Sequence, residues 1–276
     1  MDSNKITSLL ANTGDMALKR RARRILETVY PAPGDRILDI GCGDGYYLHL
    51  LSELQVPGVI LQGSDFDKDA LISARKNLTG KKIKLDFGDL MKKLPYRNNS
   101  FNKIVMSEVA EHLPDDLRGL KEVYRVLRPG GILALSVPNA NYPFFWDPVN
   151  KLLETLFATH IKSGFWAGLW NKHIRLYTCK EIESVIKKAG FSIISIEATT
   201  FWCLPFNHYL VNLTARAIHS GKLAADLKSA LNKFETKTSK PPLINLAFRI
   251  ANQVDKLNDI FPVAQSGVGV FVAAKK

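Results

Sequence analysis

Three glycines at alternate positions, Gly41, Gly43 and Gly45, follow a short apolar run that ends close to an acid, Asp39. Glycine adopts positive φ and carries no Cβ, so the backbone of such a turn can approach a ligand closely. A helix that begins at about Tyr46 would point its free N–H groups at the same place. The spacing is GxGxG rather than the GxGxxG of dinucleotide-binding folds, and Asp39 would repel a pyrophosphate. The turn is therefore predicted to hold a ligand with a cationic group.

Residues 39–45, DIGCGDG, resemble motif I of the class I methyltransferases that use S-adenosylmethionine (SAM), in particular their small-molecule, type 11-like branch. In that family the glycine loop packs under the methionine end of SAM, and the acid organises its amino group. The resemblance implies that SAM is the cofactor and that Asp39, Gly41, Cys42, Gly43 and Gly45 bind it. A plain strand-to-helix turn could also use glycines, so the motifs further along the chain must decide.

The second predicted strand, residues 58–65, also ends on an acid, Asp65. It follows the glycines by about 20 residues, the spacing at which a carboxylate that accepts from both ribose hydroxyls is expected in a nucleoside site. Asp67 is the alternative, but it begins the next helix, where an acid is favoured as an N-cap. We therefore assign the ribose to Asp65 and place its neighbour Phe66 in the same cofactor site.

Two further strand ends complete the cofactor site that the resemblance implies. After the third predicted strand, Asp89 is expected to accept from the adenine amino group and Leu90 to pack against the ring, although Asp89 could be an ordinary turn acid. Ser107 ends the fourth strand and is assigned to the cofactor, since ligands of open parallel sheets bind outside the carboxyl ends of the strands. Glu108 and His112 follow at the same edge, where His112 is expected to anchor the loop rather than to act as a base.

Strands that alternate with helices predict an α/β sheet wound on both faces with right-handed crossovers. The resemblance implies a Rossmann-like methyltransferase fold of seven strands, mostly parallel with the last strand antiparallel. The chain departs from the bare fold in the long segments after strands 5 and 6, which predict helical insertions there. The predicted units are an N-terminal basic helix (1–35), a SAM-binding core (36–138, 177–199 and 267–276), an aromatic lid (139–176) and a helical insertion (200–266).

The lid leaves the fifth strand at its carboxyl end, so we expect it to cover the active site, exclude water and hold the methyl acceptor. Large aromatic side chains recur along it: Phe144, Phe145, Trp146, Phe157, Phe165, Trp166 and Trp170. The alternative is a small satellite core under a long loop.

An oxygen or carbon acceptor must lose a proton, and the lid region offers the candidate catalytic residues His173 and Tyr177, with His160 behind them. His173 comes first because HIRLYT follows the aromatic segment directly. The alternative for His173 is a hydrogen-bonded anchor of the lid.

Charge and cysteine content bear on partners and compartment. Lys and Arg exceed Asp and Glu by 12, which favours an anionic partner such as a lipid surface, a phosphorylated substrate or nucleic acid. The basic helix predicted for residues 15–30 and an interfacial cluster of aromatic and apolar side chains are compatible with peripheral contact with an anionic membrane; the cluster is Phe201, Trp202, Leu204, Phe206 and Tyr209. The alternative for the basic helix is a solvated face on a helix that leads into the core. Three irregularly spaced cysteines argue against a disulfide framework or a zinc site, so no metal is predicted and a cytoplasmic location is expected.

The sequence thus predicts methyl transfer from SAM to a small, hydrophobic or lipid-linked acceptor. Two alternatives stay open. A nucleic-acid methyltransferase fits the net charge, but no NPPY-type base-clamping motif follows the fourth strand, where SEVAEHL stands instead. A non-catalytic SAM-binding protein is the other, because a fold alone never proves activity. The oligomeric state and the identity of the acceptor are not predicted.

Overall fold

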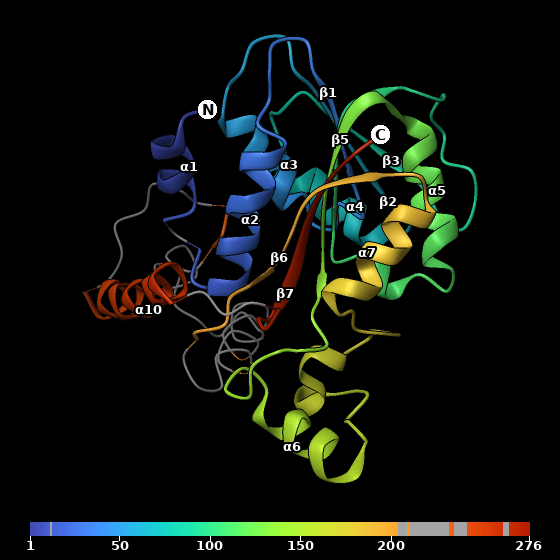
Figure 1. The fold of residues 1–276 in the computed structure, drawn as a ribbon. Coiled ribbons are helices and arrows are strands. Elements are labelled where there is room, and N and C mark those ends of the chain that lie inside the picture. The colour runs from blue at the N-terminus through green and yellow to red at the C-terminus, as the bar shows by residue number, and fades with distance from the viewer. Residues whose placement is uncertain (12, 204–208, 210–212, 214–231, 235–241, 262–264) are drawn as a thin grey trace.

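The computed structural model has one seven-stranded sheet, with the strand order β3-β2-β1-β4-β5-β7-β6 (Figure 1). The strands are β1 (Arg36–Ile40), β2 (Ile60–Asp65), β3 (Ile83–Phe87), β4 (Phe101–Ser107), β5 (Leu127–Pro138), β6 (Ser192–Thr199) and β7 (Gly269–Lys275). β1 to β5 pair in parallel, and β7 is antiparallel to both β5 and β6. The predicted fold class is confirmed. The structure describes the chain except residues 12, 204–208, 210–212, 214–231, 235–241 and 262–264.

Helices cover both faces of the sheet, because successive residues of each strand point to opposite sides. Ile37 of β1 packs with α1 (Ser3–Leu9), α2 (Met16–Thr28), α3 (Tyr46–Glu53) and α4 (Lys68–Asn77). The next residue, Leu38, packs with α5 (Asp116–Val126) and α7 (Cys179–Lys188) on the other face. Figure 1 shows these two layers, with α2 and α3 on one side of the sheet and α5 and α7 on the other. The sheet is therefore buried on both faces, and its carboxyl edge is left for ligands.

Side chains that cap helices fix where several of these helices begin. Asp15 accepts from two backbone N–H groups at the start of α2, and Asp67 does the same for α4. Thr178 and Glu181 form a capping box on α7. This capping role matters for the site, because Asp67 was the alternative to Asp65 as the ribose-binding residue. The Asp67 carboxylate already accepts from the N–H groups of Asp69 and Ala70.

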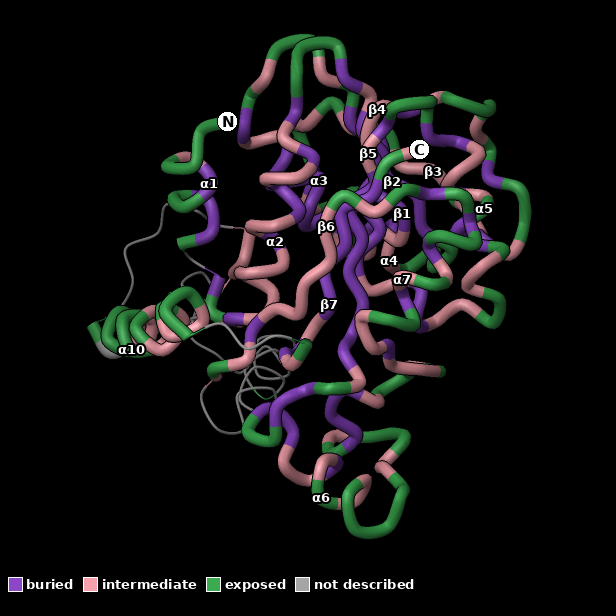
Figure 2. Tube along the Cα trace, in the orientation of Figure 1, coloured by how far each residue is buried: buried purple, intermediate pink, exposed green. Residues whose placement is uncertain are grey.

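The lid region extends beyond the carboxyl edge of the sheet and contains α6 (Pro148–Phe157) and the 3-10 helix η2 (Phe165–Trp170) (Figure 1). Some aromatic side chains of the lid are buried and others are exposed to solvent. Tyr142 and Trp146 are buried in a small cluster with Leu169 and Val268, the satellite core that was the alternative. Phe144, Phe145, Phe157 and Trp166 are each about half exposed or more, and Figure 2 shows the exposed stretches around α6.

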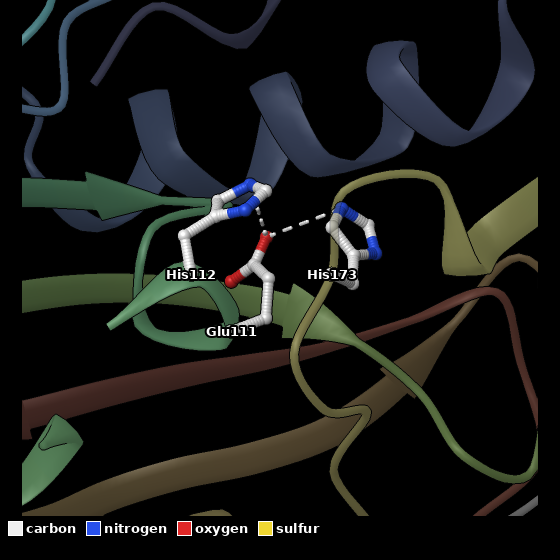
Figure 3. Close-up of side chains that lie close together, drawn as sticks. All are labelled: Glu111, His112 and His173. Atoms are coloured by element: carbon white, nitrogen blue, oxygen red, sulfur yellow. Dashed lines mark ion pairs between the residues drawn. The ribbon is translucent and has the colours of Figure 1, made fainter. Parts of the chain in front are cut away.

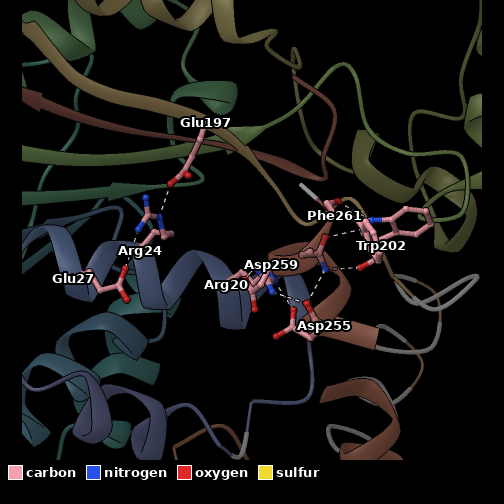
Figure 4. Close-up of polar contacts among 9 residues, drawn as sticks. Arg20, Arg24, Glu27, Glu197, Trp202, Asp255, Asp259 and Phe261 are labelled. Carbon is pink, nitrogen blue, oxygen red and sulfur yellow. Dashed lines mark hydrogen bonds and ion pairs between the residues drawn. The ribbon is translucent and has the colours of Figure 1, made fainter. Parts of the chain in front are cut away.

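Two arginines of α2, Arg20 and Arg24, pair with acids of the same chain (Figure 4). Arg20 bonds Asp255 and Asp259 of α10 (Pro242–Ile260), and Arg24 bonds Glu197 of β6 and Glu27. Glu27 belongs to α2 itself, whereas Glu197, Asp255 and Asp259 lie far from the helix in sequence, so the charge pattern of residues 15–30 alone did not reveal these three acids.

The aromatic cluster that is compatible with membrane contact is only partly described. Leu204 and Phe206 lie outside the described residues. Trp202 hydrogen-bonds Asn258 and the carbonyl of Phe261 (Figure 4), and Tyr209 is buried against Asp147. In the part of the chain that the structure describes, none of the helices combines the length and the apolar character that crossing a bilayer requires.

Candidate functional site

The glycine loop leaves β1 at its carboxyl end and has the backbone that only glycine adopts easily. Gly41 and Gly43 have φ of 68° and 52°. A Cβ on Gly41 would lie 2.3 Å from Val109 Cγ2, whereas a Cβ on Gly43 would have no heavy atom within 4 Å. The loop therefore packs against the segment after β4 at Gly41 and leaves open space over Gly43. Cys42 is buried beside them, and its N–H donates to the carbonyl of Ser64 (3.1 Å).

Asp39, at the end of β1 beside this loop, has a buried carboxylate without a hydrogen-bond partner among the described residues. It is 1% exposed, and neither oxygen has a hydrogen-bond partner among the described residues. Burial raises the pKa of Asp39 well above its usual value, and the charges of Asp65 and Asp44 raise it further. An unpaired buried carboxylate is costly, and a cation is its natural partner. The amino group of SAM fits that requirement.

Asp65 joins the end of β2 to the glycine loop. Its Oδ2 accepts from the N–H of Gly43 (2.8 Å), and its Oδ1 accepts from the N–H of Asp67 (2.9 Å). The side chain is buried, and the neighbouring Phe66 is 68% exposed at the same edge. The structure therefore brings Asp65 against the loop, while Asp67 turns to the N-terminus of α4.

Asp89 and Leu90 follow β3 at the same edge. The N–H of Gly88 donates to the carbonyl of Asp65 (3.0 Å), which ties the two strand ends together. Asp89 Oδ1 accepts from the N–H of Met91 (2.8 Å), the bond of an ordinary turn acid, and Leu90 is buried. One oxygen of Asp89 thus shapes the turn, and Oδ2 lies 3.9 Å from Lys92 Nζ.

Ser107 belongs to a closed ring of polar contacts that sequence reasoning did not find. Arg21 donates to the Tyr47 hydroxyl (3.1 Å), which lies 3.0 Å from Ser107 Oγ. Ser107 Oγ lies 2.8 Å from Ser136 Oγ, Ser136 donates to Glu108 Oε1 (3.2 Å), and Glu108 Oε2 pairs with Arg21 (3.0 Å). Burial alone would lower the pKa of the Arg21 guanidinium, but Glu108, Tyr47 and Asp15 together outweigh burial and raise it above its usual value. The ring fastens α2 across the carboxyl ends of β4 and β5.

A second cluster lies just beyond this ring, on the 3-10 helix η1 (Ala110–His112) and in the lid (Figure 3). Glu111 Oε1 is 3.8 Å from His112 Nε2 and 3.9 Å from His173 Nε2. The Glu111 side chain is fully buried, and neither of its oxygens has a hydrogen-bond partner in the described residues. Burial, followed by the charge of Glu108, raises the pKa of Glu111 well above its usual value. The sequence singled out His173 and placed His112 at this edge, but not Glu111 between them.

Tyr177, the other predicted catalytic residue, is buried and hydrogen-bonded within the protein. Its hydroxyl donates to Asp116 Oδ2 (2.7 Å) and also lies 3.2 Å from the carbonyl oxygen of Ala110. The residue is buried, and burial raises the pKa of its hydroxyl above the usual value. A phenol that is held protonated in this way positions η1 and α5 rather than removing a proton.

Residues 15–196 match the family model described as a methyltransferase domain. The chain is 27% identical over 187 residues to a demethylmenaquinone methyltransferase of Staphylococcus aureus, a match that spans 64% of this chain and 76% of that protein.

Two solved structures share the fold. One is a SAM-dependent methyltransferase of Thermotoga maritima, named as a possible histamine N-methyltransferase (TM-score 0.55, 16% identity, 95% of this chain and 90% of that one). The other is a SAM-dependent methyltransferase of Mesorhizobium loti (TM-score 0.53, 17% identity, 94% and 98%). At these identities the likeness concerns the arrangement of helices and strands.

Proposed function

Since this chain belongs to the class I SAM-dependent methyltransferases, we propose that it transfers the methyl group of SAM to a small, hydrophobic or lipid-linked acceptor. The observation that carries the donor half is the partnerless, buried carboxylate of Asp39 beneath the open space over Gly43. SAM supplies a methyl group on a sulfonium, which is already a good leaving group. The protein's work is then to bind SAM, orient the acceptor in line with the methyl group and exclude water.

Each cofactor residue has a proposed role that its position supports. Asp39 pairs with the amino group, and Asp65 accepts from the ribose hydroxyls while it holds the loop through Gly43. Asp89 and Leu90 contact the adenine from the end of β3. Cys42, Gly41, Gly45, Phe66 and Ser107 line the remainder of the site.

The acceptor half rests on the lid. The exposed side chains of Phe144, Phe145, Phe157 and Trp166 offer an apolar surface beyond the carboxyl edge of the sheet, which suits a hydrophobic acceptor drawn from the cytoplasmic face of an anionic membrane. We propose that His173 acts on the acceptor, and that Tyr177 positions the segment that carries it. The Staphylococcus aureus relative, named for demethylmenaquinone, supports a small-molecule acceptor rather than a macromolecule.

A nucleic-acid acceptor is the second candidate, and α2 counts against it. Arg20, Arg21 and Arg24 form ion pairs with acids of the same chain. Backbone phosphates are bound by cations that are free to pair with them, so the excess of positive charge does not by itself create a phosphate-binding face.

The experiment that tests the acceptor class is a labelling assay. Purified protein and SAM with a labelled methyl group are mixed with membrane and soluble fractions of a cell extract, and the products are separated into organic solvent, protein and nucleic acid. We expect label in the organic phase of the membrane fraction. Label in nucleic acid would favour the second candidate. Calorimetric binding of SAM with label in no fraction would indicate a non-catalytic binding protein.

Replacing Asp65 by Ala is expected to weaken SAM binding by about 1.5 to 3 kcal/mol, the usual loss for hydrogen bonds to a charged group. Calorimetric titration with SAM and S-adenosylhomocysteine measures this. Asp67→Ala is the matched control, because it removes a neighbouring carboxylate that caps α4; it should lower thermal stability, by about 1 kcal/mol, and leave affinity unchanged. Equal losses of affinity in the two variants would contradict the ribose assignment.

A further inference from the structure

Glu111, His112 and His173 present three metal-ligating groups to one point. One ligand atom from each lies within 4.8 Å of the others. Donors that share a first-row metal ion at about 2.0 to 2.2 Å are separated from one another by about 3.0 to 3.5 Å. The separations of 3.8 and 3.9 Å from Glu111 Oε1 to the two imidazoles, and of at most 4.8 Å within the group, must therefore shorten by side-chain rotation to enclose an ion. Figure 3 shows both histidines turned toward the carboxylate from separate segments.

The carboxylate of Glu111 has no other partner that would satisfy it. Separations of 3.8 and 3.9 Å are too long for hydrogen bonds to the imidazoles, and no described residue bonds either of its oxygens. Glu108 and Arg21 act on it electrostatically in opposite directions, and Arg21 is itself paired with Glu108. A fully buried carboxylate in this position requires a compensating cation.

His112 is held with a lone pair directed at Glu111. His112 Nδ1 lies 3.0 Å from the carbonyl oxygen of Lys172. A carbonyl can only accept, so Nδ1 carries the proton and Nε2 is left as a ligand atom, the usual second hydrogen bond of a metal-binding histidine. The N–H of Ile174 also donates to the carbonyl of Glu111 (3.0 Å). These two bonds clamp the segment that carries His173 onto η1.

We infer that Glu111, His112 and His173 bind one divalent transition-metal ion, with Zn²⁺ as the best match. Two imidazoles and one carboxylate suit Zn²⁺, Fe²⁺ or Co²⁺, whereas Mg²⁺ and Ca²⁺ prefer oxygen donors alone. Three protein ligands leave a further coordination position open. The side chains of His112 and His173 are 37% and 15% exposed, which gives an ion and a small molecule access from the lid side.

The site lies beside the donor loop, so a bound ion would activate the methyl acceptor. This role rests on the proposed methyl transfer. Val109, two residues before Glu111, contacts the loop at Gly41. A hydroxyl acceptor bound at the open position would release its proton to solvent more readily, because the ion stabilises the oxyanion. The oxyanion would then attack the methyl carbon: a C–O bond forms, the S–C bond breaks, and its electron pair stays on sulfur as the neutral thioether.

The test uses the full-length protein after treatment with a chelator and titration with Co²⁺, which reports its coordination by visible absorption. One equivalent should bind with absorption bands of a site with nitrogen ligands, and Zn²⁺ should displace it. Glu111→Gln and His112→Gln should each weaken binding by about 100-fold or more. His160→Gln is the control, since this imidazole stacks on Trp170 in the same lid outside the cluster, and it should bind as the wild type does.

Calorimetric binding of SAM to each variant shows that it is folded and tests the donor site separately. Equal Co²⁺ affinity in the wild type and Glu111→Gln, or no specific equivalent at all, would overturn the inference. Co²⁺ binding by a protein that never transfers a methyl group would leave the metal site standing and remove the proposed function. Full methyl transfer by chelator-treated protein in the presence of chelator would overturn the role of the ion in the reaction.

Discussion

Replacing Asp39 by Asn is expected to weaken SAM binding severely while making the ligand-free protein more stable. The carboxylate is buried and has no partner in the described part of the chain, and its proposed partner is the amino group of SAM. Removing one member of a buried ion pair costs about 3 to 5 kcal/mol, which corresponds to a loss of affinity of roughly 100- to 1000-fold or more. Asparagine keeps the shape of the side chain and removes only its charge.

The gain in stability has a defined pH dependence. Burial, with Asp65 and Asp44, raises the pKa of Asp39 in the folded state, so the folded protein retains a proton that the unfolded chain releases above about pH 4. The wild type therefore loses stability as the pH rises from there through the folded pKa. Asp39→Asn lacks this loss. Its advantage in the free energy of unfolding should be on the order of 1 kcal/mol at neutral pH and should vanish near pH 4.

Thermal unfolding at several pH values and calorimetric titration with SAM together test this prediction. Because Asp39 should ionise when it meets the amino group, proton release on SAM binding is expected in the wild type and should be lost in the variant. A variant that binds SAM normally would exclude Asp39 from the donor site. A variant less stable than the wild type at neutral pH would show that the carboxylate is satisfied in the free protein.

The parts of the site that the sequence predicted are those in which a local requirement dictates the residue type. The glycines at 41, 43 and 45 are needed because each has positive φ. Asp67 and the pair Thr178 and Glu181 bond N–H groups within three residues of themselves. Such interactions join residues that are close in sequence. The donor loop, the helix starts and the order of elements could therefore be predicted from the sequence.

The contacts on the acceptor side of the site could not be predicted in this way, because they join segments that are distant in sequence. Arg21 meets Glu108 across the ends of α2 and β4, and His112 and Lys172 are 60 residues apart. Nothing in the neighbourhood of Glu111 in sequence shows that His173 will lie opposite it. The prediction of no metal followed from the spacing of the cysteines, whereas the proposed ligands come from two separate segments.

Replacing Gly168 by Ala is expected to abolish methyl transfer while SAM binding persists. The buried Asp147 organises the lid: it accepts from Tyr209 (2.5 Å), from the side chain of Asn150 (2.9 Å) and from the N–H of Leu169 (3.3 Å). A Cβ on Gly168 would lie 1.6 Å from Asp147 Oδ2, so the carboxylate must leave these donors. Each buried donor left unpaired costs about 1 to 3 kcal/mol, in addition to the strain at φ 54°, and the lid should open locally.

Gly164→Ala is the matched control, because Gly164 also has positive φ but an added Cβ there would meet no atom within 4 Å. Backbone strain of about 1 to 3 kcal/mol is then its only cost, and the network around Asp147 stays intact. Hydrogen exchange should show lost protection in residues 147–170 for Gly168→Ala, with the protection of β1 to β5 unchanged, and a much smaller effect for Gly164→Ala. An open lid with undiminished methyl transfer would mean that the acceptor binds elsewhere on the sheet edge. Loss of SAM binding together with transfer would mean that the lid folds as one cooperative unit with the core.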